Sequence, residues 1–151
     1  MTETPNVPDF DLDGFTPYRL AVAAQKLSEQ LAKQYRVQFG ISIPEWRVLT
    51  HLSRSAGNVR VSVRDIEVRV AMEKSKVSRA ASRLEENGYI MKTVNDNDRR
   101  LVRLSLTDKG RALMAELLPL AIAFQKEISA KLDETLDGFE AGLDRLLEED
   151  D

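Results

Sequence analysis

The sequence predicts a mainly α-helical fold with one small β-hairpin, which places it in the α+β class. Apolar residues recur at steps of three and four through most of the 151 residues, the spacing of one face of an α-helix. Residues 90–106 are the exception, because two short β-prone runs there flank a polar segment. Helix start and stop residues separate these segments, so the order of the elements can be predicted along the chain.

The N-terminal segments are an arm and a helix. Residues 1–14 are polar, acidic and proline-containing, which predicts a mobile arm. A helix is expected over residues 15–40, with Thr16 as its N-cap, Pro17 in its first turn and Gly40 at its end. One apolar face of this helix consists of Leu20, Ala24, Leu27, Leu31 and Tyr35.

Residues 41–110 hold three further helical patterns. The first begins near Ser42, with Pro44 in its first turn. The second is expected after Ser62-Val-Arg-Asp65, which resembles a capping box. The third is the basic segment Glu73–Leu84, which a glycine at position 88 should end.

A hairpin follows the basic helix. Its two strands are expected at Ile90–Val94 and Leu101–Leu106. A helix, a basic helix and a hairpin with arginines at its tip, in that order, are typical of a winged helix-turn-helix. Such a motif places one helix in a DNA major groove and a ribbon in the neighbouring minor groove.

Residues 111–151 predict two more helices, the first capped by Thr107 and the second beginning near Leu132-Asp133. Their apolar stripes and that of residues 15–40 are long, and the winged motif has a core of its own. We therefore expect the N- and C-terminal helices to form a dimerisation region with a second copy of the chain. The alternative is that they pack back on the same chain.

Composition excludes several classes of protein. The chain has no cysteine, which removes disulfides, thiolate metal sites and cysteine nucleophiles, and its one histidine cannot build a histidine-rich metal site. No catalytic residues, metal or cofactor are therefore expected, and the chain is not expected to be an enzyme. No apolar run approaches the roughly 20 residues of a membrane span, and the first residues do not resemble a signal peptide, so a cytoplasmic location is expected.

The net charge of −3 is distributed unevenly. Residues 41–110 hold 14 Lys and Arg against 9 Asp and Glu, whereas residues 111–151 hold 4 against 11. Because phosphate binding depends on a local basic surface and not on the total charge, this distribution favours double-stranded DNA as a partner of residues 41–110.

The candidate DNA-binding residues lie on the basic helix and at the hairpin tip. On the helix, Val77, Ala80, Ala81 and Leu84 share the face expected to be buried. Arginine can bind guanine with two hydrogen bonds, and an arginine at a hairpin tip can enter the narrow minor groove. The alternatives are an ordinary solvated basic helix and a polar turn. The candidate residues are Lys74, Ser75, Lys76, Ser78, Arg79, Ser82, Arg83, Asp98, Arg99 and Arg100.

The sequence resembles the multiple antibiotic resistance regulator (MarR) family of bacterial transcription factors over nearly its whole length. The matching segments are Ile43-Pro-Glu-Trp-Arg-Val-Leu49, Val77-Ser-Arg79, Arg83-Leu-Glu-Glu-Asn-Gly-Tyr-Ile90, Asp98-Arg-Arg100 and Leu104-Ser-Leu-Thr-Asp-Lys-Gly110. The resemblance implies a homodimer that binds a pseudo-palindromic operator. It implies groove contacts by Ser75, Lys76, Ser78 and Arg79, and a minor-groove contact by Arg100 that Asp98 braces.

The chain departs from the family pattern in two respects. Glu73 stands where the family usually has a Ser or Asp cap on the recognition helix, and the absence of cysteine excludes thiol-based oxidation sensing. The resemblance also implies a small aromatic or phenolic effector, for which Tyr18, Trp46, Arg47 and His51 are candidate pocket residues. Structural roles, such as a core aromatic or an ion-pair partner, are the alternative for these side chains.

The sequence therefore predicts a homodimeric, sequence-specific DNA-binding transcriptional regulator, most simply a ligand-responsive repressor. The alternative is a winged-helix module that binds DNA without sequence preference, or that binds another protein. Comparing operator with random DNA at one salt concentration separates these functions.

Overall fold

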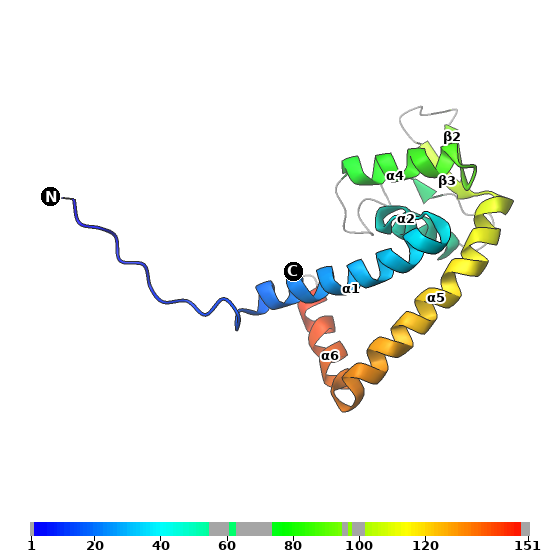
Figure 1. Ribbon diagram of the computed structural model, residues 1–151. Helices are drawn as coiled ribbons and strands as arrows, with labels where there is room; N and C mark the ends of the chain where they lie inside the picture. The colour runs from blue at the N-terminus through cyan, green and yellow to red at the C-terminus, as the bar shows by residue number, and fades with distance from the viewer. Residues whose placement is uncertain (1, 55–60, 63–73, 95–96, 98–101, 149–151) are drawn as a thin grey trace. The chain divides into compact units, whose positions relative to one another are not determined.

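The computed structural model describes residues 2–54, 61–62, 74–94, 97 and 102–148 (Figure 1). The chain divides into two compact units, residues 1–43 and 44–151. Long helices and one small antiparallel sheet are the regular elements among the described residues, which confirms the predicted α+β class.

The first unit consists of the arm and helix α1 (Thr16–Phe39). The prediction that Thr16 caps this helix is wrong: Phe15 is the N-cap, and Thr16 is already helical. Pro17 is compatible with either start, because the first turn of a helix needs no backbone N–H at that position. Gly40 ends α1 as predicted, with φ of 66° in the left-handed region. Near this end Tyr35 is buried, and the burial raises its pKa to about 12.

The residues before α1 form a local turn. The backbone N–H of Gly14 donates to the Asp11 carboxylate at 3.1 Å, and the rings of Phe10 and Phe15 meet edge to face with their centroids 5.0 Å apart. The mobility expected for residues 1–14 stays a prediction.

The second unit begins with α2 (Ile43–Arg54), whose first turn contains Pro44 as predicted. Strand β1 (Val61–Ser62) and helix α4 (Lys74–Glu86) follow. Ser62, the first residue of the expected capping box, lies in strand β1. The rest of that box and the helix expected after it fall in residues 63–73, outside the described residues.

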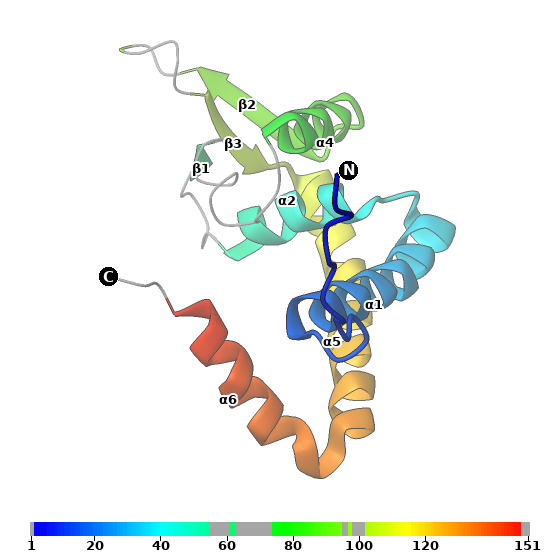
Figure 2. The same cartoon turned by 90° about the vertical axis from the view of Figure 1, so that its left-hand side faces the viewer.

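The sheet has the strand order β1-β3-β2 and is antiparallel throughout (Figure 2). Strands β2 (Ile90–Val94) and β3 (Val102–Leu106) form the predicted hairpin, in a register that pairs Ile90 with Leu106. Strand β1 pairs Val61 with Leu104 and was not predicted, since a two-residue strand leaves no alternation to detect.

Helix α5 (Asp108–Leu132) follows the hairpin, and its N-cap is Thr107 as predicted. The short 3₁₀ helix η1 (Asp133–Thr135) then leads to α6 (Leu136–Leu147), which confirms the turn expected near Asp133.

The core of the second unit is built from α2, α4, the sheet and the first half of α5. Val48, Leu49, Val77, Leu84 and Leu104 are each fully buried. The buried residues of α5 all lie between Gly110 and Leu117, and α6 has none. The packed part of the unit is therefore the part that carries α4.

Candidate nucleic-acid interface

Helix α4 is held in place by one apolar face. Val77, Ala80, Ala81 and Leu84 are buried, as the sequence predicted. Their spacing of three and four residues places them on one side of the helix. The remaining residues of α4 are exposed, so the helix presents a polar surface over a rigid base.

The end of α4 is fixed by backbone hydrogen bonds. The N–H of Tyr89 donates to the Leu84 carbonyl at 2.9 Å, and the N–H of Gly88 donates to the Glu85 carbonyl at 3.0 Å. Together with the φ of 80° at Gly88, this pair of bonds is a Schellman motif, which confirms the predicted glycine stop.

The first turn of α5 also holds the end of α4. The Thr107 hydroxyl donates to the Gly88 carbonyl at 2.6 Å and accepts from the Gly110 N–H at 3.1 Å. The Lys109 ammonium donates to the Asn87 carbonyl at 2.7 Å and lies 4.7 Å from the centre of the Tyr89 ring. We call these contacts of Thr107, Lys109 and Gly110 the α4–α5 junction.

Two stripes, each with the spacing i, i+3, i+7, run along the exposed surface of α4, which also includes Lys74, Glu85 and Glu86. The serine stripe consists of Ser75, Ser78 and Ser82, and the cationic stripe consists of Lys76, Arg79 and Arg83. They are offset by one residue, which is about 100° around a helix of 3.6 residues per turn.

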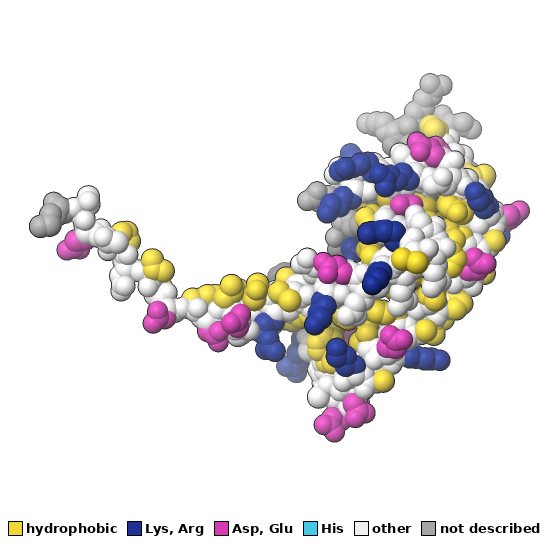
Figure 3. Space-filling model, viewed as in Figure 1, with side chains coloured by type: hydrophobic (Ala, Val, Ile, Leu, Met, Phe, Trp, Pro, Cys, Tyr) yellow, Lys and Arg dark blue, Asp and Glu magenta, His cyan; other side chains and the backbone are white. Residues whose placement is uncertain are grey.

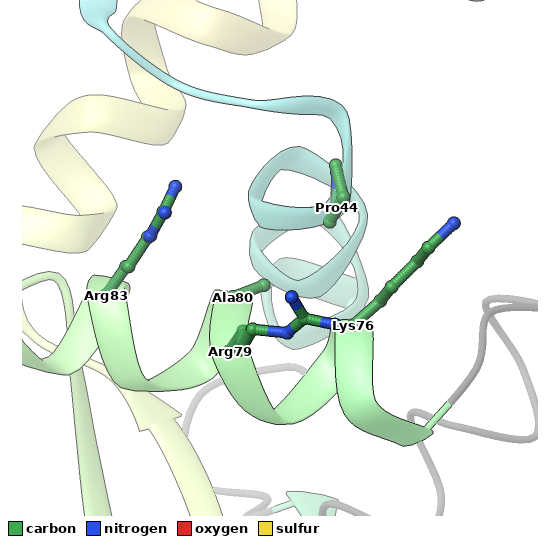
Figure 4. Close-up of a pocket in the computed structure, with 5 residues that line it drawn as sticks. All are labelled: Pro44, Lys76, Arg79, Ala80 and Arg83. Atoms are coloured by element: carbon green, nitrogen blue, oxygen red, sulfur yellow. The ribbon is translucent and has the colours of Figure 1, made fainter.

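The cationic stripe borders a surface hollow of about 250 Å³. Its lining residues are Pro44 from the first turn of α2 and Lys76, Arg79, Ala80 and Arg83 from α4 (Figure 4). The Nε–H of Arg79 donates to the Ser75 carbonyl at 3.3 Å, so this side chain lies back along the helix. The hollow is therefore bordered by three cationic side chains, with Arg83 and Lys76 on opposite sides of Ala80 (Figure 4).

Charge is segregated within the second unit. Lys and Arg side chains gather over α4, whereas Asp and Glu side chains gather at the turn between α5 and α6 (Figure 3). The turn contributes Asp133 and Glu134. A polyanion is therefore attracted to the α4 surface and repelled from the far end of α5.

The structure places the predicted site residues unequally. Lys74, Ser75, Lys76, Ser78, Arg79, Ser82 and Arg83 all lie on the exposed surface of α4. Strand β2 ends at Val94 and β3 begins at Val102, and the predicted wing residues Asp98, Arg99 and Arg100 lie outside the described residues, as does Glu73.

The four candidate pocket residues are spread over two helices. Trp46 and Arg47 are half-buried and His51 is buried, all on α2. Tyr18 is 41% exposed on α1, in the other unit. None of the four lines the hollow beside α4.

Sequence reasoning missed two parts of this surface. It did not separate the serines from the cations of α4, although their equal spacing was available as a signal. It also missed Pro44 and Lys109, because only the fold brings Pro44 beside the middle of α4 and Lys109 to its C-terminal end. Among the described residues, no group of three or more His, Cys, Asp or Glu is placed to hold a metal ion.

Comparison with known proteins shows which family the chain is similar to. The MarR family model matches residues 39–101, which include α2, α4, β2 and the segment before β3. Over these residues the chain is similar to the MarR family. This confirms the resemblance found in the sequence, and members of this family are DNA-binding transcription regulators and not enzymes.

Two relatives and one solved structure show the extent of the similarity. The transcriptional regulator BilQ of Clostridioides difficile is 27% identical over 71% of this chain and 68% of its own length. The transcriptional repressor MprA of Escherichia coli is 31% identical over 74% of this chain, but the match spans only 62% of MprA. A MarR/EmrR family transcriptional regulator from Acinetobacter sp. ADP1 superposes with a TM-score of 0.79 at 28% identity, over 91% of this chain and 95% of that one.

These similarities establish a winged-helix fold and relatives that regulate transcription. No helix within the described residues is both long and apolar enough to cross a membrane.

Proposed function

We propose that this protein is a sequence-specific transcriptional repressor that binds a pseudo-palindromic operator as a homodimer and releases it when a small effector binds. The surface of α4 carries the proposal: one face is buried in the core, and the opposite surface offers only polar and charged side chains. A rigid polar helix suits insertion into a major groove, because its side chains can reach base edges without the helix losing its support.

The proposed roles on α4 are supported by the exposed positions of its residues, and those on the wing by the resemblance to the family. Lys74, Ser75, Lys76, Ser78, Arg79, Ser82 and Arg83 contact DNA from α4. From the wing, Arg100 is proposed to enter the minor groove, braced by Asp98, and Arg99 is proposed as a further DNA contact; these three residues lie outside the described residues. A bound dimer blocks the promoter by covering it, with its two α4 helices in successive major grooves about 34 Å apart.

Binding of the purified protein to the DNA upstream of its own gene tests this function. Fluorescence anisotropy would compare that duplex with a scrambled one at about 150 mM salt, where non-specific binding is already weakened. We expect a preference of about 10³ or more and two protomers per site. Equal affinity for both duplexes, followed by failure to select any preferred sequence from genomic DNA, would contradict sequence-specific regulation.

Homodimerisation is supported by apolar surface that the single chain leaves uncovered. On α6, Phe139 is 45%, Leu146 64% and Leu147 76% exposed, and on α1 Val22 is 46% exposed. An isolated helix of 12 residues is only marginally stable in water, so α6 needs a surface to cover its apolar face. A second copy of the chain provides one, since two-fold operators require two recognition helices.

Sedimentation tests the dimer. The wild-type protein should have twice the chain mass of 17.1 kDa, and the double variant Phe139→Ser, Leu146→Ser should have the single mass. Met91→Ser is the matched control, because Met91 is 49% exposed on β2 and lies outside the proposed interface. A wild-type protein that sediments as a monomer at micromolar concentration would contradict the proposal.

The effector is proposed to be a small aromatic or phenolic acid that contacts Tyr18, Trp46, Arg47 or His51. The half-buried Trp46 and Arg47 support it, since one can stack on a ring and the other can pair with a carboxylate. Trp46 is the sole tryptophan, so quenching of its fluorescence reports a nearby ligand directly. Aromatic acids that release DNA without altering this fluorescence would place the effector elsewhere.

A further inference from the structure

The two stripes of α4 differ in what surrounds them, and this difference suggests a division of roles. The cationic stripe lies beside the first turn of α2, where Pro44 completes the hollow (Figure 4). The serine stripe is about 100° around the helix from it. A helix in a major groove presents one side to the base edges and its flanks to the phosphates of the groove walls.

The hollow has the chemistry of a phosphate site. Lys76, Arg79 and Arg83 supply three positive charges around about 250 Å³, which is room for a phosphate group and water. Pro44 has no backbone N–H to donate. Among the lining residues, the donors of hydrogen bonds to an anion are therefore the side chains of α4. Arg79 uses its Nε–H on the Ser75 carbonyl and keeps the N–H groups of both Nη atoms for an anion.

We propose that this hollow holds one phosphate of the DNA backbone, shared by Lys76, Arg79 and Arg83, and that the serine stripe is thereby placed against the base edges. The inference rests on the proposed DNA-binding function and deepens it. Short serine side chains allow close approach of the helix, and their hydroxyls both donate and accept hydrogen bonds. The cations fix the position of the helix, and the serines read the sequence.

A shared site predicts a particular salt dependence. Each phosphate that is neutralised contributes about 0.9 to the slope of the logarithm of the binding constant against the logarithm of salt concentration. Replacing all three cations, in the triple variant Lys76→Gln, Arg79→Gln, Arg83→Gln, should therefore lower the slope by about 0.9. Three separate phosphate contacts would lower it by about 2.7 instead.

The slope should be measured by anisotropy on both operator and scrambled duplexes. We expect the triple variant to lose the same increment of slope on both, because a phosphate contact carries no sequence information. Lys126→Gln, an exposed lysine on α5, is the matched control and should leave the slope unchanged. Thermal melting by circular dichroism establishes that each variant is folded.

The serine variants provide the complementary measurement. Ser75→Ala with Ser82→Ala should leave the slope unchanged and alter the ranking of single-base operator variants, whereas the triple cation variant should keep that ranking. Three results for the triple variant would each overturn the shared phosphate site: an unchanged slope, a slope lowered by about 2.7, or an altered ranking of the operator variants. If the protein had no sequence preference, the proposed function would be contradicted. The slope on scrambled DNA would still show whether the three cations share one phosphate.

Discussion

Helices α4 and α6 are nearly equal in length, with 13 and 12 residues, but they differ in how far the rest of the chain buries them. Four residues of α4 are buried, although its sequence is mostly polar, whereas none of α6 is buried, although its sequence is more apolar. Burial here follows from position in the fold and not from composition. The single chain completes the surroundings of α4 and leaves the apolar residues of α6 exposed.

Together with the proposed dimer, this difference predicts which part of the molecule folds by itself and which part depends on association. A helix with an intrachain core should lose stability on truncation at any protein concentration. A helix whose apolar face is covered by a second copy should lose stability in a concentration-dependent way. Single substitutions in the two helices can therefore distinguish the two situations.

The largest effect is expected for Leu84→Ala in α4. Leu84 is fully buried, so its truncation should lower the free energy of unfolding by about 2–5 kcal/mol. Urea unfolding at two protein concentrations measures this loss, which should be the same at both. Leu146→Ala in α6 is the control, since Leu146 is 64% exposed. If Leu146→Ala lowers the free energy of unfolding as much as Leu84→Ala at low concentration, where the monomer dominates, α6 is buried within the single chain. The two helices would then not differ in what covers their apolar faces.

Glycine substitutions should have opposite signs in the two regions. A methyl group on Gly110 would overlap the carbonyl oxygen of Tyr89, so Gly110→Ala should destabilise the protein by about 1–3 kcal/mol despite the higher helix propensity of alanine. Gly142 in α6 has open space around its Cα, so Gly142→Ala should stabilise the monomer by about 0.5–1 kcal/mol. Thermal unfolding of the two variants gives the comparison. A stabilising Gly110→Ala would show that the first turn of α5 can shift away from Tyr89.

The sequence was sufficient to predict most of the elements but not their surroundings. Periodicity and stop residues located α4, its buried face and its end at Gly88, because those signals are local. The same signals could not reveal β1, which is short, or the true cap of α1, where Pro17 is compatible with either start. The seven predicted α4 residues share an exposed surface. All but Lys74 fall into the two stripes, and what distinguishes the stripes is the neighbouring Pro44, which precedes Lys76 by 32 residues in the sequence.

The smallest effect is expected at the α4–α5 junction, where Lys109 binds the last turn of the recognition helix. Lys109→Met removes a cation from the helix C-terminus and from the Tyr89 ring, and should cost about 0.5–1 kcal/mol. The junction links α4 to the first turn of α5, the helix that leads to the exposed α6, so it is one route, beside the shared core, by which movement of α5 can reach α4. Hydrogen exchange should therefore show faster opening of the amides of Asn87, Gly88 and Tyr89 in Lys109→Met, with Lys126→Met unchanged. Equal protection in wild type and Lys109→Met would mean that the Schellman motif alone fixes the end of α4 and that the junction transmits nothing.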